Sequence, residues 1–251
     1  LSAGFASAEE IYIPLISKGF QHQFWQVVKA GAEQAAKDLN VKVTFEGPES
    51  EAMVDKQIDM LSAAISKKPA AIGYAALDAK AAIPLLKKAQ AAKIPVICFD
   101  ACVDSDIPLT LAATDNVAAS AHAADKMAEL IGGSGEVAYL GSDQTQTTGI
   151  TRRDGFMNRM KEKYPNIKVV SMQFGGGDHL KSTEIAKTVM QANPNLKGYY
   201  GSNEGSIVGV INAAKEMDRK LVIVGYDSGK AQKQPSLMVW KPAPSRRTRS
   251  A

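Results

Sequence analysis

Apolar residues along the chain fall into two alternating patterns. Short β-branched runs, such as the one that ends at Phe99, predict buried strands, and longer stretches with apolar residues three and four positions apart predict helices. The predicted strands cover residues 10–16, 41–45, 70–75, 95–99, 109–113, 136–140, 168–173, 198–200 and 221–225. The predicted helices cover residues 22–39, 52–66, 78–92, 117–131, 149–163, 180–192 and 204–217.

Strands joined by helical crossovers pair in parallel, and such crossovers are right-handed in almost all proteins. Each half of the chain carries enough of these units for a small doubly wound sheet. We therefore predict an α/β protein with an N-terminal lobe at 9–113 and a C-terminal lobe at 114–228. Thr114-Asp115-Asn116 supplies a helix N-cap at the boundary, and the absence of glycine and proline there indicates a short hinge.

One strand in each half runs into an aromatic residue followed directly by an acid. These pairs are Phe99-Asp100 and Tyr226-Asp227. Ligands of open α/β sheets bind beyond the carboxyl ends of the strands, so both acids are expected in one pocket between the lobes. Each acid taken alone is also compatible with a helix N-cap.

Composition fits a folded domain and weakens nucleic-acid binding. The 251 residues are 45% hydrophobic and 22% charged, and no run of 18 apolar residues occurs. The net charge is +4, but residues 230–251 contain six basic residues and no acid, so the preceding residues carry −2. A mildly acidic body does not favour a nucleic-acid partner.

Both ends of the chain differ from the body. Ala6 and Ala8 form an A-x-A pattern typical of a signal-peptidase site, so residues 1–8 are interpreted as a signal-peptide remnant, with a frayed terminus as the alternative. Residues 229–251 are interpreted as an aberrant basic tail, and its last segment, from Lys241 to Ala251, has no amphipathic period, which predicts disorder.

Motifs for catalysis, phosphate binding and metal binding are missing from the sequence. It contains no G-x-x-x-x-G-K-[ST], no G-x-S-x-G and no paired histidines, and its three histidines lie far apart. Gly175-Gly176-Gly177 precedes a predicted helix and is interpreted as a flexible connection, with an anion cradle as the alternative. Cys98 and Cys102 would lie about 13 Å apart in an extended chain, so two thiols are predicted unless the chain folds back after Asp100.

The remaining polar and aromatic loop residues suit a polyhydroxylated ligand. Sugars offer apolar C–H faces to aromatic rings and hydroxyl groups to carboxylates, amides and arginine. Phe24 and Trp25 begin the first long helix, although one of them could belong to the core. Arg152 and Arg153 are placed at a helix start, where the helix dipole disfavours them, so we expect one to bind ligand and the other to face solvent. Asn203 is a candidate hydroxyl partner as well as a good N-cap.

Six ordered motifs carry a resemblance that spans about residues 9–229. They are Phe24-Trp25 followed by Lys29-Ala30-Gly31-Ala32-Glu33, Ile94-Pro95-Val96-Ile97 with Phe99-Asp100, Thr114-Asp115-Asn116, Arg152-Arg153-Asp154-Gly155-Phe156, Ser202-Asn203-Glu204 and Val224-Gly225-Tyr226-Asp227. In their order and spacing the chain resembles the periplasmic sugar-binding proteins of the ribose and galactose type, which are substrate receptors of ABC importers. The resemblance implies the type I periplasmic binding protein fold.

The resemblance also implies a function and a set of binding residues. A monosaccharide or polyol would be held between the lobes and delivered to an ABC transporter permease by hinge closure, without catalysis, cofactor, metal or nucleic acid. The receptor would be a periplasmic monomer, and a chemoreceptor is a further partner that the family allows. A sugar-responsive regulator or sensor domain without its output module is the alternative. The implied ligand-binding residues are Phe24, Trp25, Asp100, Arg152, Asn203 and Asp227.

Several departures from the family pattern concern the pocket and the C-terminus. Ala101 stands where ribose receptors have arginine after the acid, and Ala75 where they have asparagine. A longer first loop brings Lys18, Phe20 and His22 near the mouth. The family continues beyond Gly229 with elements that complete both lobes, so we expect a C-terminally truncated product that binds sugar weakly or not at all.

Overall fold

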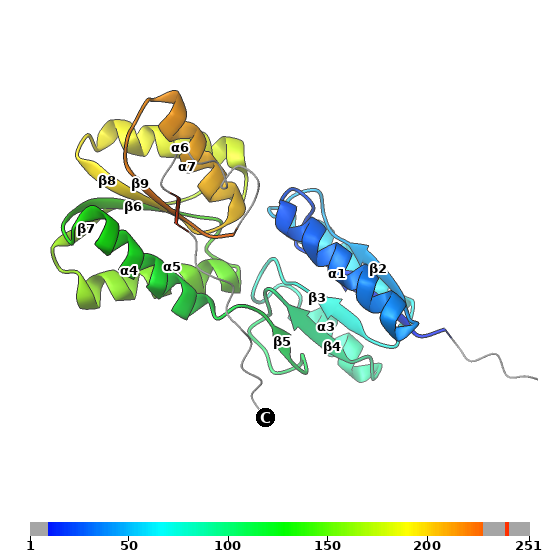
Figure 1. Ribbon diagram of the computed structural model, residues 1–251. Coiled ribbons are helices and arrows are strands. Elements are labelled where there is room, and N and C mark those ends of the chain that lie inside the picture. Colours follow the sequence, from blue (N-terminus) through cyan, green and yellow to red (C-terminus); the bar gives the residue numbers. More distant parts are fainter. Residues whose placement is uncertain (1–9, 228–238, 241–251) are drawn as a thin grey trace, which may run out of the picture.

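The alternating apolar patterns fold into two parallel sheets with helices between most successive strands; β4 and β5 are joined by a loop (Figure 1). The computed structural model describes residues 10–227 and 239–240. All neighbouring strands in both sheets run parallel, which confirms the predicted α/β class with two doubly wound lobes. The predicted signal remnant lies outside the described residues.

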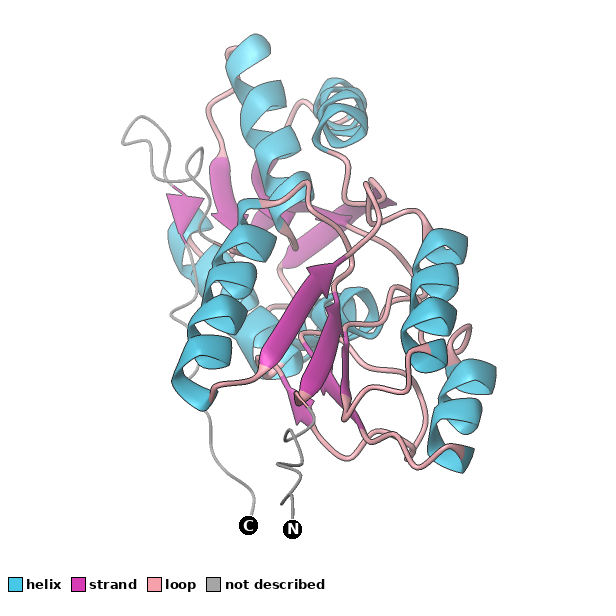
Figure 2. Cartoon of the chain, turned by 90° about the vertical axis from the view of Figure 1, so that its right-hand side faces the viewer, coloured by secondary structure: helices cyan, strands magenta, loops and turns pink. Residues whose placement is uncertain are grey.

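The first sheet has the strand order β2-β1-β3-β4-β5. Its elements, in chain order, are β1 (Tyr12–Ile16), α1 (Gln23–Leu39), β2 (Lys42–Glu46), α2 (Val54–Ser66), β3 (Ile72–Tyr74), α3 (Ile83–Ala91), β4 (Val96–Phe99) and β5 (Leu111–Ala112). Figure 2 shows this sheet between helices on its two sides. Lys18 and Asp100, which lie just beyond β1 and β4, line a pocket together with residues of the second lobe.

The second sheet has the order β10-β9-β8-β6-β7. Its elements are α4 (Asn116–Ile131), β6 (Gly135–Gly141), α5 (Thr147–Lys163), β7 (Ile167–Phe174), α6 (His179–Ala192), β8 (Leu196–Gly201), α7 (Glu204–Glu216), β9 (Val222–Gly225) and β10 (Val239–Trp240). Within the predicted tail at 229–251, Val239 and Trp240 form a short strand that extends the sheet beside β9. The rest of the predicted tail lies outside the described residues.

Apolar packing differs between the lobes. In the second lobe, one core cluster lies under α4 and α5 and another under α6 and α7, so both sheet faces are covered. In the first lobe, the described core cluster joins the sheet to α2 and α3. Of the α1 residues, only Trp25 is buried, while Val27 and Leu39 are 73% and 71% exposed.

The helix predicted at 78–92 begins later than expected, at Ile83. Asp78 instead accepts hydrogen bonds from the backbone N–H groups of Lys80 and Ala81, and turns precede the helix. Pro84 explains the late start, because proline is tolerated in the first turn of a helix but not in its interior. The other predicted helices and strands agree with the structure to within a few residues at each end.

Local caps fix the connection between the lobes. Asp115 accepts a hydrogen bond from the Ala118 N–H at 3.0 Å, as predicted for an N-cap, and α4 ends at Gly132, whose φ of 77° suits glycine. Within the described residues, no helix combines the length and apolar character needed to cross a membrane.

Candidate functional site

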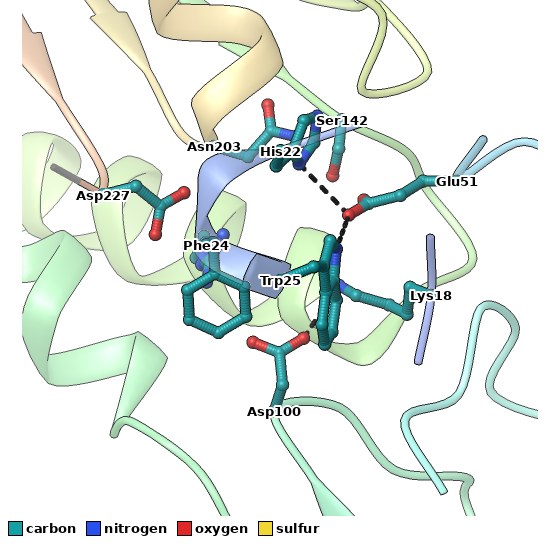
Figure 3. Close-up of a pocket in the computed structure, with 10 residues that line it drawn as sticks. Lys18, His22, Phe24, Trp25, Glu51, Asp100, Ser142, Asn203 and Asp227 are labelled. Carbon is teal, nitrogen blue, oxygen red and sulfur yellow. Dashed lines mark hydrogen bonds and ion pairs between the residues drawn. The ribbon is translucent and has the colours of Figure 1, made fainter. Parts of the chain in front are cut away.

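A narrow pocket, partly open to solvent, lies between the lobes at the carboxyl ends of the strands (Figure 3). All six residues predicted to bind ligand line it, together with residues that the sequence did not select as binding residues. The lining residues are Lys18, His22, Phe24, Trp25, Glu51, Asp100, Ser142, Arg152, Asn203 and Asp227. The sequence therefore predicted which strand ends and loops meet, but missed part of the polar lining.

Asp100 sits on a sharply folded loop after β4. Its φ is 60°, its N–H donates to the Ala112 carbonyl, and the Ala101 N–H donates back to the Phe99 carbonyl at 2.7 Å. This tight turn brings the Cα atoms of Cys98 and Cys102 to 5.3 Å, and the two form a disulfide. The prediction of two thiols is therefore wrong, because the chain folds back at Asp100 instead of continuing extended.

Lys18 provides the cation that faces Asp100. Its Nζ lies 3.0 Å from Asp100 Oδ2 and donates to Gln146 Oε1 and Thr148 Oγ1 of the second lobe, both at 3.2 Å. Burial lowers the pKa of Lys18, but the charges of Asp100 and Glu51 outweigh it and raise that pKa. A lysine from the first loop thus supplies the positive charge that faces Asp100.

Asp227 follows β9 with a φ of 69°, so both strand-end acids adopt the left-handed backbone region. Its carboxylate forms no hydrogen bond or ion pair with any residue that the structure describes. Burial raises the pKa of Asp227, and the Arg152 charge lowers it to a smaller extent. This acid is thus a desolvated acceptor in the pocket.

The aromatic pair at the start of α1 is held by a buried acid. Phe24 and Trp25 pack edge to face with ring centroids 4.9 Å apart. Trp25 is 1% exposed and its Nε1–H donates to Glu51 Oε1 at 2.8 Å. Burial alone would raise the pKa of Glu51, but the charges of Lys18 and His22 lower this pKa by a larger amount. Glu51 is therefore ionised. Trp25 is therefore both a core residue and a pocket residue.

Arg152 connects the start of α4 to the end of β8. Its Nε donates to Asn116 Oδ1 at 2.8 Å, its Nη1 donates to the Ser202 carbonyl at 3.0 Å, and its guanidinium lies 3.8 Å from the centre of the Tyr226 ring. Because α5 starts at Thr147, Arg152 lies in the second turn, which corrects the predicted helix-start position. Arg153 instead pairs with Asp154 and is more exposed.

Asn203 caps a helix, as predicted, and also lines the pocket. Its Oδ1 accepts a hydrogen bond from the Ser206 N–H at 2.9 Å and so caps α7. Its Nδ2 is buried at the pocket without a hydrogen-bond partner among the described residues. A buried donor without a partner is costly, so this group suits a ligand acceptor.

Two further contacts join the lobes near the start of α1. His22 Nε2 lies 2.8 Å from the Gly177 carbonyl oxygen of the β7–α6 loop. The Glu204 carboxylate of α7 accepts hydrogen bonds from the N–H groups of Gln23 and Phe24 at 2.9 and 3.2 Å. The predicted connection role of Gly175 to Gly177 is confirmed, since this loop leads from β7 to the N-cap Asp178 of α6.

The charges of the lining residues balance. Three cations, Lys18, His22 and Arg152, face three acids, Glu51, Asp100 and Asp227. Such a lining favours a neutral ligand with many hydroxyl groups over an anion or a cation. No group of three or more metal-binding side chains occurs in the described part of the chain.

Comparisons with known proteins agree on one family. Residues 13–235 match the family model described as periplasmic binding protein domain. The D-allose-binding periplasmic protein of Escherichia coli is 28% identical over 236 residues, which cover 90% of this chain and 75% of that protein. The D-apiose import binding protein of Actinobacillus succinogenes is 26% identical, with 89% and 72% covered.

Solved structures give the same result. A carbohydrate transporter solute-binding protein from Agrobacterium radiobacter, in complex with D-arabinose, superposes with a TM-score of 0.86 at 33% identity, covering 90% of this chain and 78% of that one. A solute-binding protein from Agrobacterium vitis with bound D-fucose gives 0.85 at 30% identity, with 88% and 78% covered. The chain belongs to the periplasmic binding protein domain family.

Proposed function

We propose that this chain is the solute receptor of an ABC importer and binds a monosaccharide or related polyol between its lobes. One observation carries the proposal: the pocket combines two aromatic rings with a balanced set of buried charges contributed by both lobes. The relatives and structural neighbours with known ligands, which include D-allose and D-arabinose, support the same chemistry.

The six residues selected from the sequence have distinct roles in this proposal. Phe24 and Trp25 contact the C–H faces of the sugar, and Asp100 and Asp227 accept from its hydroxyl groups. Arg152 and Asn203 donate to ring or hydroxyl oxygens, since a guanidinium has five N–H groups and Arg152 uses two of them on Asn116 and Ser202. The sugar thus bridges two lobes that move about residues 113–116.

Membership of the family also supports a transport partner and a location for the receptor. The closed receptor delivers its sugar to a membrane permease as a monomer, and no bond of the sugar is broken. A periplasmic location is supported by the name of the E. coli relative and by the Cys98–Cys102 disulfide, because disulfides persist in oxidising compartments.

A thermal-shift screen over D-allose, D-ribose, D-arabinose, D-fucose and xylitol tests the function. Ligand at about 100 times its Kd stabilises by about 2.7 kcal/mol, which corresponds to a rise in Tm of roughly 5–10 °C. The thermal shift depends only on the ratio of ligand concentration to Kd, so a calorimetric titration that shows micromolar affinity is what would contradict the weak binding expected for this chain. No rise with any sugar or polyol, in a folded sample, contradicts the proposed function.

Tryptophan fluorescence locates the binding event. The sequence contains only Trp25 and Trp240, so Trp240→Phe leaves Trp25 as the single tryptophan. Its emission is expected to change on saturation with the sugar that gives the largest thermal shift. An unchanged spectrum, together with sugar recovered chemically altered, would favour an enzyme acting elsewhere in the cleft.

A further inference from the structure

His22 lies between the two lobes and contacts both of them. It is 7% exposed, its Nδ1 lies 3.2 Å from Glu51 Oε1, and its Nε2 lies 2.8 Å from the Gly177 carbonyl oxygen. Glu51 belongs to the first lobe and Gly177 to the second. Figure 3 shows the His22 ring at one end of the pocket, with the dashed line to Glu51.

Both partners of the ring can only accept hydrogen bonds. A carbonyl oxygen has no proton to give, and Glu51 is ionised because it is surrounded by Lys18, His22 and the Trp25 N–H. Each ring nitrogen must therefore carry a proton, so His22 is an imidazolium in this closed arrangement. The other charged groups near the ring are Glu204 of α7 and Asp227 after β9.

The Gly177 carbonyl is held in place by the backbone around it. Gly177 has a φ of 74°, and a Cβ atom on Gly205 in the first turn of α7 would overlap the Gly177 carbonyl. The β7–α6 loop therefore rests directly on α7 and presents a fixed acceptor to the first lobe. The contact between His22 and the Gly177 carbonyl therefore gives the run Gly175 to Gly177 a structural role besides connecting β7 to α6.

A continuous chain of contacts runs from an aromatic ring of the pocket to the second lobe. Trp25 donates to Glu51, Glu51 accepts from His22, and His22 donates to Gly177. The same Glu51 oxygen receives both side chains, so the position of the Trp25 ring depends on where His22 holds that carboxylate. Opening the cleft would break only the last of the three contacts.

We propose that His22, as an imidazolium, is a positioning residue for ligand binding: through Glu51 it orients Trp25, and through Gly177 it ties the lobes together around the ligand. The proposal rests on the proposed sugar-binding function for the nature of that ligand. The proposal further requires that His22 is protonated when the lobes are closed.

The proton makes closure depend on pH. Burial lowers the pKa of His22, but the Glu51 carboxylate and the Gly177 carbonyl outweigh it and raise the pKa to about 9. In the open form the Gly177 contact is lost, so the ring holds its proton less firmly. Closing therefore favours the protonated ring, and sugar affinity is expected to fall as pH rises through the pKa of the closed form.

The first measurement needs no sugar. Nitrogen-15 NMR of the imidazole rings, with His22 assigned as the resonance lost in His22→Gln, is expected to show both nitrogens protonated at pH 7, because the contact with Glu51 lies within the first lobe and does not depend on closure. A neutral ring at pH 7 overturns the proposal. This result is independent of whether any sugar binds.

The second measurement is a calorimetric titration with the sugar selected by the thermal-shift screen. Wild-type affinity is expected to fall about tenfold between pH 7 and 9.5, since one unit of pKa difference is a tenfold change. His22→Gln is expected to bind more weakly at pH 7 and to lose this pH dependence, while His122→Gln, which alters an exposed residue of α4, keeps it.

The outcomes separate the two proposals. A His22→Gln protein that retains the wild-type pH profile at lower affinity shows a merely structural role and overturns the inference. If no sugar binds the wild type, the proposed function fails, and the NMR measurement alone decides the protonation of His22: an imidazolium supports the inference, and a neutral ring contradicts it.

Discussion

Asp100 and Asp227 end matching strands in the two lobes, yet their surroundings differ. Each follows an aromatic residue and adopts a positive φ, and both line the same pocket. Asp100 faces Lys18 at 3.0 Å on a loop closed by a disulfide, whereas Asp227 has no bonding partner among the described residues. One acid is therefore paired with a cation of the protein, and the other is the one that the proposed function assigns to a ligand hydroxyl group.

Of the substitutions that test this difference between the acids, Asp100→Asn should lower the free energy of unfolding most. Removing one partner of a buried ion pair leaves Lys18 without its nearest anion and costs roughly 3 kcal/mol in the free energy of unfolding, measured by urea denaturation. Adding Lys18→Met should recover much of the loss, because an apolar pair is tolerated where a lone charge is not. An Asp100→Asn protein as stable as the wild type would contradict the role of the pair.

Asp227→Asn is the matched substitution in the other lobe. It should weaken sugar binding but leave the free energy of unfolding nearly unchanged. Loss of a charged acceptor weakens binding of the screened sugar by roughly 10- to 100-fold in calorimetry, from a hydrogen bond worth about 1.5–3 kcal/mol. The free protein should keep its stability or gain up to about 1 kcal/mol, because a desolvated charge is removed. A loss of stability equal to that of Asp100→Asn would erase the distinction between the acids.

The pH dependence of the free energy of unfolding gives a further test of the difference between Asp100 and Asp227. Burial raises the pKa of Asp227, so near that pKa the folded state binds more protons than the unfolded state, and the free energy of unfolding decreases as pH rises. The stability gain of Asp227→Asn is therefore expected at neutral pH and should shrink in acid. Urea denaturation of both proteins from neutral to acidic pH measures it, and a gain independent of pH would contradict the assignment.

Replacing the disulfide should have the smallest effect. In the double variant Cys98→Ser, Cys102→Ser, the Asp100 loop is less restrained, and ordering one side chain on binding costs about 0.5–1.5 kcal/mol, or a 2- to 10-fold loss of affinity. The control is the same pair of substitutions combined with Asp100→Asn, where no further loss is expected. A further loss there would show that the disulfide acts elsewhere.

The order of elements was predictable because apolar spacing is a local property of the chain. The rule that ligands bind beyond strand ends brought Asp100, Asp227 and Asn203 to one pocket without any knowledge of the fold. The start of α3 was misplaced only because the role of Pro84 in a first turn was not weighed against helical spacing.

Other features depend on the tertiary fold and could not be read from the sequence. A positive φ at Asp100 is an uncommon choice for a residue with a Cβ atom, and it alone decides whether the two cysteines meet. Glu51 lies before α2 without a distinctive motif, and Glu204 was noted only as the neighbour of Asn203. Their partners are about 26 and 180 residues away in the chain.

The contact between Glu204 and α1 has a consequence for the order of that helix. The first N–H groups of a helix need acceptors, but the N-cap His22 offers no side-chain cap and the first turn contains no acid. Glu204 supplies the missing acceptor from the other lobe. When the lobes part, the first turn of α1, which carries both aromatic rings, loses its cap and should fray. Closing the cleft therefore completes a helix as well as a pocket.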